Sequence, residues 1–497
     1  MKQKAYELLE TFIESNSKKW NVKINKYSGS CLIEGLGLWV TQVHQVARCG
    51  KVIEEKYAYK PYVLLNDKNE RSDFFVKLYK SYNIYNFIYF KNYLGNFFLL
   101  IKVFFYFIFF RKSISDNTKF KGILIGDLYI DTLLASKRKS SFFNKERLRF
   151  ILIFNYFVYK NILRKYNIKY VVLGDKQYMD IGLLHRISIF NDIKVIVSAG
   201  PRVKAYNKSN YLQSFFHPGI PYNEIVLANN KSSKEIVTIL EDRMSGHNKQ
   251  HDAKNAYENK IEYTREMFLQ HLNIQNSKPL VFLFPHIFKD SPHGSEYLLF
   301  EDYYDWFKQT IICLGNNRNI NVVVKPHPSA YMYGEDNIIE SYIKNIENVY
   351  LCPKDFNNHS LIDCCDYIVT CQGTVALEFA CFGLKAVVAG AGYYNGYGIV
   401  KEFSTSLDYL MFLKNLDEEE CNSRLSTEIK DKALQIFYYI YNTEIIDKLF
   451  PSEIMYNNDV NNEELYWKKI YNNLKELLEN MDNKENNLYL YSIKKTC

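Results

Sequence analysis

The sequence predicts two doubly wound α/β domains that are joined by a linker and followed by a helical tail. Short apolar runs typical of strands alternate with longer helical patterns, which is the signature of layered α/β folds. The alternation stops at a polar stretch near the middle of the chain and then restarts. The length of 497 residues also exceeds one ordinary domain of about 150 residues.

The first half of the chain contains five predicted strands and two predicted helices. The strands are expected at residues 62–65, 122–125, 170–173, 194–197 and 224–228. Helices are expected at residues 144–165, where apolar residues recur every three to four positions, and at residues 179–190. We therefore expect an N-terminal α/β domain over residues 1–228. Residues 229–278 are polar until a helix near residues 261–272, and we interpret them as a linker with a helix.

The second half repeats the alternation. Strands are expected at residues 280–284, 321–324, 349–351, 367–370 and 386–389, and helices at residues 302–314, 338–346 and 374–382. Runs of four or five apolar residues are typical of parallel strands buried on both faces. We expect a C-terminal α/β domain over residues 279–415 and a helical tail over residues 416–497. Ligands of such sheets bind beyond the carboxyl ends of the strands.

The composition excludes several classes of protein. Apolar residues make up 47% of the chain and charged residues 24%, which excludes wholesale disorder and a polytopic membrane protein. The first 20 residues lack the apolar core and the cleavage site of a signal peptide. Ten cysteines include no Cys-x-x-Cys pair and no zinc-binding spacing. We therefore expect a cytoplasmic protein with reduced core thiols.

Residues 93–110 form the most apolar run and lie in a basic part of the chain. From Lys51 to Lys121 there are 13 Lys and Arg against 6 Asp and Glu. A transmembrane helix needs about 20 apolar residues, and Lys102 interrupts the run, so a buried or interfacial helix is favoured over a membrane span. Aromatic residues flanked by cations suit peripheral contact with an anionic membrane at its inner, cytoplasmic face. The interleaving of basic and apolar residues argues against nucleic acid as a partner.

A cation, an imidazole and a hydroxyl follow the predicted strand 321–324 at once, as Lys325, His327 and Ser329. Pro326 stiffens the turn because proline fixes its own φ and restricts the preceding residue. Lys325 supplies a positive charge, and His327 can donate a hydrogen bond to a phosphate oxygen. The alternative is a strand-end turn with a surface histidine.

A glycine-containing turn follows the predicted strand 367–370. Gly373 allows a diphosphate to approach the backbone, and the N–H groups of Gly373, Thr374 and Val375 are expected to point at an anion, helped by the helix dipole. Glu378, one turn into the helix, can accept hydrogen bonds from ribose or sugar hydroxyls. The alternative is a capped turn in which Glu378 pairs with the dipole.

Two more loops follow strands of the same predicted sheet. One contains Asp290, and the other contains Tyr393 and Tyr394, which we expect to pack against a base or sugar. Four loops at one edge of a sheet predict one ligand-binding crevice. No Asp-x-Asp, Walker A, Gly-x-Ser-x-Gly or His-Glu-x-x-His pattern occurs. We therefore expect phosphate charge to be held without a divalent metal.

At these residues the chain resembles bacterial capsule and surface polysaccharide biosynthesis proteins of the GT-B glycosyltransferase type, including Kdo-type capsule transferases, polysialyltransferases and teichoic acid glycerophosphotransferases. The similar segments are HIFKD ending at Asp290, KPHP at 325–328, LIDCCDYIVTCQGTVALEFACFG at 361–383 and GILIGDLYIDTLL at 122–134. The resemblance implies two Rossmann-like domains that face a cleft. It also implies that His327 contacts the donor phosphate, that Thr374 holds phosphate and that Glu378 holds the sugar or ribose.

The resemblance implies sugar transfer from a nucleotide-activated donor to a growing polysaccharide or glycolipid, with no cofactor. The C-terminal domain would bind the donor and the N-terminal domain the acceptor. An inverting transfer also needs a carboxylate base. Asp127 and Asp131, which follow the predicted strand 122–125, are the candidates, and Asp175 and Asp180 are the alternatives. Three other functions stay open: a CDP-polyol glycerophosphotransferase, a nucleotide-sugar 2-epimerase and a non-catalytic polysaccharide assembly protein.

Overall fold

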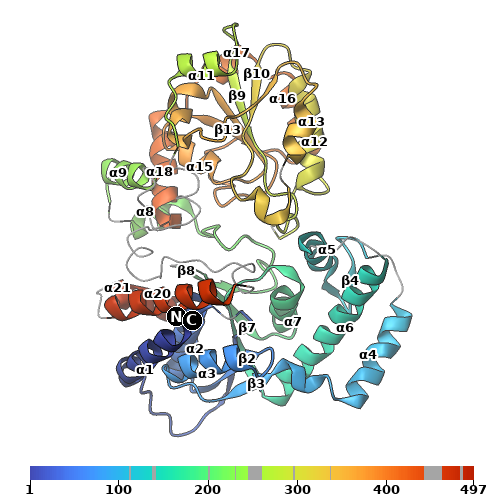
Figure 1. The fold of residues 1–497 in the computed structure, drawn as a ribbon, viewed down its shortest axis with the longest axis vertical. Coiled ribbons are helices and arrows are strands. Elements are labelled where there is room, and N and C mark those ends of the chain that lie inside the picture. Colours follow the sequence, from blue (N-terminus) through green and yellow to red (C-terminus); the bar gives the residue numbers. More distant parts are fainter. Residues whose placement is uncertain are drawn as a thin grey trace. The chain divides into compact units, whose positions relative to one another are not determined.

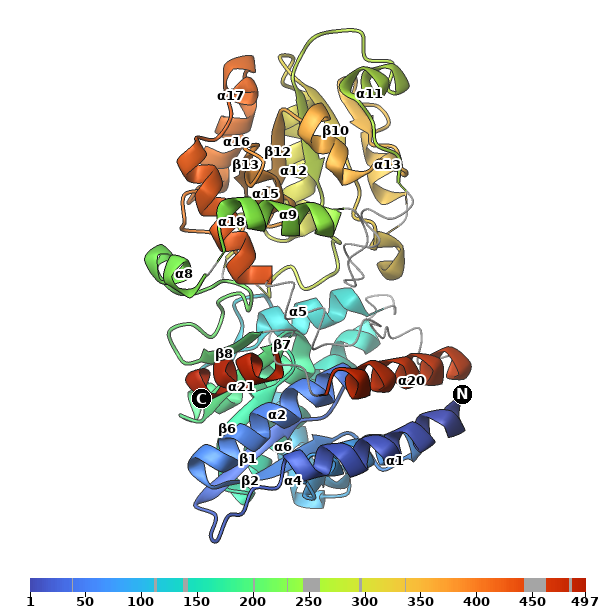
Figure 2. The same ribbon diagram turned by 90° about the vertical axis from the view of Figure 1, so that its left-hand side faces the viewer.

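The chain forms two compact units. The structure is a computed structural model that describes residues 1–37, 39–110, 114–136, 142–199, 202–229, 231–244, 260–294, 297–335, 337–441, 462–481 and 485–497. Unit 1 comprises Met1–Tyr211 and Glu444–Cys497, and unit 2 comprises Leu212–Thr443. Figures 1 and 2 show the ribbon from two sides.

Unit 1 is built on a six-stranded sheet with the strand order β3-β2-β1-β6-β7-β8. Its strands are β1 (Gly29–Glu34), β2 (Tyr59–Leu65), β3 (Phe87–Tyr89), β6 (Ile168–Leu173), β7 (Lys194–Ala199) and β8 (Arg202–Tyr206). All neighbours are parallel except β7 and β8. Leu32 in β1 pairs with Tyr62 in β2 and with Val171 in β6. The strands that follow β1 in the chain are first added on one side of it, as β2 and β3, and then on the other side, as β6 and β7. The topological switch point therefore lies between β1 and β6.

The helices of unit 1 come from both ends of the chain. They are α1 (Lys2–Lys19), α2 (Val40–Tyr57), α3 (Glu70–Lys80), η1 (Phe90–Tyr93), α4 (Phe97–Phe109), α5 (Gly126–Ala135), α6 (Phe142–Lys165), η2 (Tyr178–Gly182), α7 (Leu183–Phe190), α20 (Glu463–Glu479) and α21 (Glu485–Thr496). One core cluster joins α1, α2 and α3 with α20 and α21. Figure 2 shows α20 beside α1, where Trp467 packs on Tyr6 with ring centroids 5.7 Å apart.

Unit 2 is built on a five-stranded parallel sheet with the strand order β11-β10-β9-β12-β13. Its strands are β9 (Leu280–Phe284), β10 (Asn321–Val324), β11 (Val349–Leu351), β12 (Tyr367–Thr370) and β13 (Lys385–Val388). Phe282 in β9 pairs with Val323 on one side and with Ile368 on the other. The switch point of this sheet therefore lies between β9 and β12.

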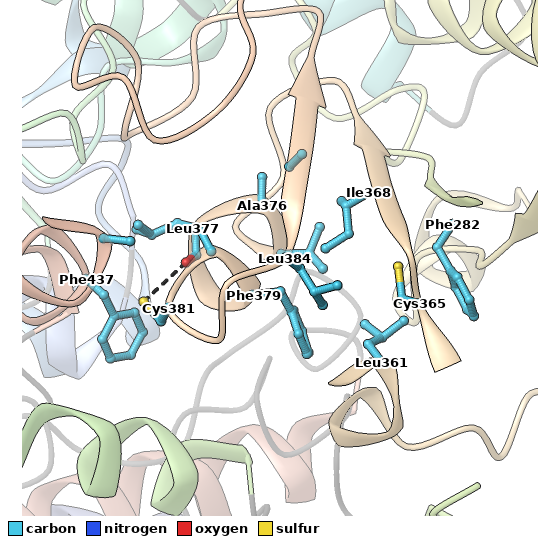
Figure 3. Packing of buried hydrophobic residues seen from close by; sticks show 14 of the residues in the cluster. Phe282, Leu361, Cys365, Ile368, Ala376, Leu377, Phe379, Cys381, Leu384 and Phe437 are labelled. Atoms are coloured by element: carbon cyan, nitrogen blue, oxygen red, sulfur yellow. Dashed lines mark hydrogen bonds between the residues drawn. The ribbon is translucent and has the colours of Figure 1, made fainter. Parts of the chain in front are cut away.

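Helices cover both faces of the unit 2 sheet. They are α8 (Tyr222–Ala228), α9 (Ser233–Met244), α11 (Arg265–His271), α12 (Tyr303–Gly315), η3 (Ala330–Tyr333), α13 (Ile338–Ile343), η4 (Asn358–Ser360), α14 (Leu361–Cys364), α15 (Val375–Ala380), α16 (Ser406–Lys414), α17 (Glu418–Asn422) and α18 (Thr427–Tyr441). Phe282 and Ile368 point into one core cluster, and Val281 and Val369 point into the other. Figure 3 shows Phe437 from α18 in the first cluster. The predicted fold class, two doubly wound α/β units with a helical tail, is confirmed.

All ten cysteines are free thiols, and nine of them are buried. Cys364 and Cys365 lie in the same core cluster, and Figure 3 shows Cys365 close to the start of β12. Their packing confirms the prediction that the cysteines are reduced core thiols.

Two predicted strands of the first half are wrong. Residues 224–228 belong to α8, where Ile225 is buried but Leu227 is 83% exposed, because a short apolar run does not distinguish a helix from a strand. Residues 122–125 contain β5 (Ile123–Leu124), which pairs only with β4 (Lys119–Phe120) in a separate antiparallel hairpin. Lys121 and Gly122 have φ values of 50° and 82°, the positive values that a two-residue hairpin turn requires.

The unit boundary falls after Tyr211, whereas the sequence placed the end of the first domain at residue 228. The reason is packing, since α8 and α9 lie against α18 in unit 2. The predicted helical tail is divided between the units, with α17 and α18 in unit 2 and with α20 and α21 in unit 1. Residues 245–259 of the predicted linker and residues 442–461 of the predicted tail lie outside the described residues.

The apolar run 93–110 contains the helix α4, and this helix is not a core element. Only Leu99 and Val103 are buried, so the interpretation as a buried helix is wrong. Asn96 caps the helix by accepting from the N–H of Leu99 at 3.1 Å. Over the parts of the chain that the structure describes, no helix combines the length and the apolar character that crossing a membrane requires.

Candidate functional site

Four loops follow parallel strands of unit 2 at one edge of its sheet. They begin after β9, β10, β12 and β13, as the sequence predicts. The first and third flank the switch point, where the connections leave toward opposite faces of the sheet and where ligands of doubly wound sheets bind. The side chains on these two loops are therefore candidates for ligand binding.

His286 joins the loop after β9 to the turn after β12. Its Nε2 atom accepts a hydrogen bond from the N–H of Gln372 at 3.2 Å, and its ring stacks on Tyr303 with centroids 4.7 Å apart. Burial, with the nearby charge of His327, lowers the pKa of His286 to about 3. His286 is therefore neutral at pH 7, and the tautomer implied by this bond leaves an N–H donor at Nδ1.

The turn after β10 carries two of the predicted cationic or hydrogen-bonding groups. The Lys325 amine donates to the carbonyl of Phe356 at 3.2 Å, and burial lowers the pKa of Lys325. His327 is exposed, and its Nδ1 accepts from the N–H of Ser329 at 3.1 Å. This bond orients the His327 ring with Nε2 as the second polar atom. Ser329 thus orients the His327 ring through its own backbone N–H group.

The turn after β12 departs from the predicted anion cradle in one respect. The N–H of Gly373 donates to the Thr370 hydroxyl at 3.3 Å, so it does not point at a ligand. The N–H groups of Thr374 and Val375 make no hydrogen bond to another described residue. The helix α15 that follows has only six residues, which limits the dipole contribution that the sequence suggested.

Glu378 does not lie among the loop groups but is buried on α15. Its Oε1 atom lies 3.2 Å from Nε of Arg243 in α9, and both side chains are less than one-tenth exposed. The Arg243 guanidinium also stacks on Tyr441, 4.6 Å from the ring centre. This pairing ties α9 and α18 to α15. Contact of Glu378 with a sugar or ribose stays a prediction.

The two tyrosines after β13 have different surroundings. Tyr394 is fully buried, and its hydroxyl donates to the carbonyl of Gly373 at 2.8 Å. This bond supports the turn after β12. The sequence predicted that Tyr394 packs against a base or sugar, but its ring is enclosed by the core and is not placed to do so. Tyr393 is half-buried and packs on Phe216 with centroids 4.8 Å apart.

Asp290 lies further along the loop after β9 and accepts from the Tyr333 hydroxyl at 2.9 Å. Glu335 accepts from the N–H groups of Phe288 and Lys289 at 2.8 and 3.0 Å. Burial raises the pKa of Glu335, and these two donors act in the opposite direction. Asp290 and Glu335 thus fix the loops after β9 and β10 to each other, which holds His286 and His327 in place.

The candidate bases in unit 1 are both buried on α5. Asp127 forms a bidentate ion pair with Arg186, with Oδ1–Nη1 and Oδ2–Nη2 distances of 2.6 and 2.5 Å. Asp131 is 1% exposed. Because α5 follows the β4–β5 hairpin rather than a strand of the sheet, neither residue lies at a strand end. A catalytic role for them stays a prediction.

The switch point of unit 1 is organised by Glu34, at the end of β1. Glu34 is fully buried and accepts hydrogen bonds from the N–H groups of Leu36 and Gly37 at 2.6 and 3.0 Å, and from the side chain of Gln42. The N–H of Gly174, after β6, donates to it at 3.4 Å. Burial raises the pKa of Glu34, and its backbone donors lower it. Glu34 therefore joins the loops after β1 and β6.

The alternative candidates Asp175 and Asp180 lie beside this junction, in the segment after β6. Asp175 is exposed, and its Oδ1 accepts from the N–H of Lys176 at 2.6 Å. Desolvation raises the pKa of Asp180, and the Asn155 side chain, which donates to it at 3.1 Å, acts in the opposite direction. Tyr178 has a φ of 55° and begins a π-helical turn. Strained backbone of this kind clusters at functional sites.

Sequence reasoning missed His286 and Glu34. His286 follows a correctly predicted strand and begins the HIFKD segment, and these were the two available signals. The strand that ends at Glu34 was not predicted, although Gly35 and Gly37 follow an apolar run there. In the described part of the chain, no group of three or more His, Cys, Asp or Glu side chains is placed to hold a metal ion.

The two units are doubly wound, and unit 2 carries histidine and lysine side chains on the loops at the carboxyl edge of its sheet. Residues 229–407 match the family described as capsule polysaccharide biosynthesis protein. The predicted resemblance to these proteins is thereby confirmed over most of unit 2. No curated protein sequence matches the chain.

Similar solved structures have low identities. The Thermosulfurimonas dismutans KpsC β-Kdo 2,4-transferase is 13% identical, with a TM-score of 0.32. The match covers 53% of this chain and 78% of the KpsC chain. Anabaena Alr3699/HepE in complex with UDP and glucose is 12% identical, with coverages of 84% and 97% and a TM-score of 0.28. Acinetobacter baumannii MurG is 12% identical, with coverages of 85% and 100% and a TM-score of 0.28. The fold class rests on the sheet topologies.

Proposed function

We propose that the protein transfers a sugar from a nucleotide-activated donor to a growing surface polysaccharide or glycolipid. The observation that carries this proposal is the placement of His286 between the turn after β12 and His327, at the switch point of unit 2. This placement lies inside the segment that matches capsule polysaccharide biosynthesis proteins. We place the reaction at the cytoplasmic side of the membrane, where nucleotide-activated sugars are made.

The donor diphosphate would lie at the ends of β9, β10 and β12. Lys325 supplies positive charge, and the imidazoles of His286 and His327 supply N–H donors. The N–H groups of Thr374 and Val375 add two donors at the same edge. Preorganised donors of this kind stabilise the charge that develops on the leaving phosphate, often by about 3 kcal/mol for each donor. Such a site needs no metal ion for this step.

An inverting transfer needs a base that removes the proton of the acceptor hydroxyl. We propose that this base comes from the segment after β6, where Asp175 and Asp180 lie at the switch point of unit 1. Two observations favour them over Asp127. Asp127 is already paired with Arg186, and it follows a hairpin outside the sheet.

Nucleotide binding tests the proposal. Thermal shifts would be measured with CMP, CDP, UDP and GDP, and the Kd of the best ligand would follow by calorimetry. We expect one nucleotide to stabilise the protein. His286→Ala and His327→Ala should each weaken the affinity for this nucleotide about tenfold or more, since a hydrogen bond to a charged group contributes about 1.5–3 kcal/mol. His271→Ala, an exposed histidine on α11, is the matched control.

The outcome also separates the other functions. Binding of no nucleotide would contradict the proposal and leave a non-catalytic assembly protein. Turnover of a CDP-polyol without a nucleotide sugar would identify a glycerophosphotransferase. Interconversion of a nucleotide sugar in the absence of any acceptor would identify a 2-epimerase. Unchanged nucleotide affinity in both histidine variants would show that the donor lies elsewhere.

A further inference from the structure

The helix α4 exposes an apolar face that no described segment covers. Of its 13 residues only Leu99 and Val103 are buried. Phe98 is 83% exposed, Phe109 70% and Phe104 58%, and further exposed apolar side chains on the helix are Phe97, Ile101, Phe105 and Ile108. A folded domain rarely leaves so contiguous an aromatic surface in water, so the face indicates an interaction surface.

A cavity of about 600 Å³ lies directly beside this face, between α4, α6 and the sheet of unit 1. Phe98 and Lys102 of α4 belong to both the cavity wall and the exposed helix. Lys160 and Arg164 come from α6, and Lys169 comes from the start of β6. Four asparagines also line the cavity: Asn96, Asn161, Asn167 and Asn191.

The cavity is strongly cationic. Lys102, Lys160, Arg164 and Lys169 form no ion pair within the described chain, and the amine of Lys102 lies 4.6 Å from the ring centre of Phe157. The one acidic wall residue, Asp192, is already paired with Lys208 at 2.6 Å. Four cations on one wall without a protein counter-ion predict an anionic ligand.

The cavity is separate from the candidate site. Its wall includes Asn167 and Ile168 at the start of β6 and Asn191–Ile193 before β7, which are the amino ends of these strands. The Glu34 junction and Asp175 lie at the carboxyl ends, a strand length of about 16 Å away. Substrates of doubly wound sheets bind at the carboxyl edge, so a ligand at the amino edge has another purpose.

We propose that α4 lies in the interface of an anionic bilayer and that the cavity beside it binds the phosphate of one lipid head group. The helix is about 20 Å long, which is too short to cross a hydrocarbon core of about 30 Å but sufficient to lie along its surface. Aromatic side chains enter the acyl boundary, while adjacent Lys and Arg side chains attract anionic lipids. The inference does not depend on the proposed sugar transfer.

Charge argues for a bilayer rather than a second copy of the chain. A twofold interface places the same surface of two subunits against itself. Two copies paired through α4 would bring Lys102, Lys160, Arg164 and Lys169 toward the same four cations of the partner, and this repulsion opposes association. A bilayer that contains anionic lipid supplies both the apolar phase and the counter-charge.

Vesicle sedimentation of the full chain tests the inference. Phosphatidylcholine vesicles would be compared with vesicles that contain 30% phosphatidylglycerol, at about 0.1 and 0.5 M NaCl. We expect binding to the anionic vesicles, at least tenfold weaker binding to the neutral ones, and a decrease at high salt because charges are screened. Phe98→Ser/Phe104→Ser and Lys160→Glu/Arg164→Glu should each reduce binding at least tenfold.

Matched controls separate this effect from misfolding and from net charge. Leu407→Ser/Met411→Ser removes two exposed apolar side chains from α16, and Lys4→Glu/Lys414→Glu makes the same change in net charge away from the cavity. Both controls should bind like the wild type. Thermal melting of every variant shows whether its fold is intact. If the controls lost binding as strongly as the test variants, the α4 surface would not be the site.

Two further readouts distinguish the other occupants. In Phe104→Trp, quenching by brominated acyl chains reports insertion of the helix, and its absence despite sedimentation would overturn the interfacial placement. Free glycerol phosphate at 10 mM should not release the protein from vesicles, and release would identify a soluble phosphate ligand instead. A dimer that Phe98→Ser/Phe104→Ser dissociates, with no vesicle binding by the wild type, would show that a second copy covers α4.

Discussion

Arg243 and Glu378 form a buried ion pair that links α9 to α15, with Nε and Oε1 3.2 Å apart. The pair gives Glu378 a structural partner at a position where the resemblance implies contact with the donor sugar. Both side chains are almost completely removed from solvent. An unpaired charge left in such a place is costly, so the two roles of Glu378 make different predictions.

Glu378→Ala should destabilise unit 2 by about 3–5 kcal/mol, because the buried Arg243 would lose its contact with the Glu378 carboxylate. The double variant Arg243→Met/Glu378→Leu should recover most of this loss, since two apolar groups replace the pair. Urea unfolding of the wild type and of both variants measures the effect. If Glu378→Ala kept its stability and lost only affinity for the donor, the structural role would be contradicted and the sugar contact supported.

The pKa of His286 predicts how pH changes stability. The folded pKa is about 3, whereas an unfolded histidine has a pKa of about 6.5. Between these values the unfolded chain binds a proton that the folded chain does not, so protonation favours unfolding. The contribution of His286 is complete above pH of about 6.5 and is lost as the pH falls toward 3.

The comparison is therefore between the wild type and His286→Gln at several pH values. The free energy of unfolding of the wild type, relative to that of the variant, should decrease between pH 7 and 4.5 by at most about 1.4 kcal/mol per pH unit. Urea unfolding at each pH supplies the values, and His271→Gln serves as the control for loss of an exposed imidazole. A difference that does not change with pH would show that folding does not lower the pKa of His286.

The sheet of unit 2 is the part of the fold that the sequence predicts best. Strands β9, β10, β11 and β12 begin and end where the sequence placed them. Most of their residues are buried on both faces, so the requirement for apolar side chains is continuous and the pattern is unambiguous. In unit 1, β1 was missed because it ends in the buried Glu34, and β8 was missed because this antiparallel strand is half exposed and alternates with Lys and Arg.

The candidate site was predicted at the level of loops but not of side-chain directions. Position after a strand is readable from sequence, and Lys325, His327 and Gly373 all lie at the expected edge. Whether a side chain points outward depends on partners that are distant in sequence. Arg243 turns Glu378 into the core, and the carbonyl of Gly373 holds the hydroxyl of Tyr394. No local pattern contains these pairings.

Tyr394→Phe tests the brace behind the turn after β12. Loss of the hydroxyl removes the hydrogen bond to the Gly373 carbonyl and should cost about 1–2 kcal/mol of stability. Nucleotide affinity should fall as well, because the turn that carries Thr374 is less firmly held. Tyr304→Phe, a more exposed tyrosine on α12, is the control and should change neither quantity. Unchanged melting temperature and affinity in Tyr394→Phe would exclude the brace.

The base for the proposed transfer can be identified by separating activity from stability. Asp127→Asn should lose about 3–5 kcal/mol of stability, because Arg186 is left without its buried counter-charge. Asp175→Asn and Asp180→Asn should keep their stability, and the one that removes the base should lower kcat by about 10²–10⁴-fold.

If the base is Asp180, its raised pKa places the acid limb of kcat/KM above the usual carboxylate value of about 3.9. Activity is then lost at a higher pH than for an ordinary aspartate, since the base must be ionised. Full activity in both variants, with loss confined to a stably folded Asp127→Asn or Asp131→Asn, would return the base to α5.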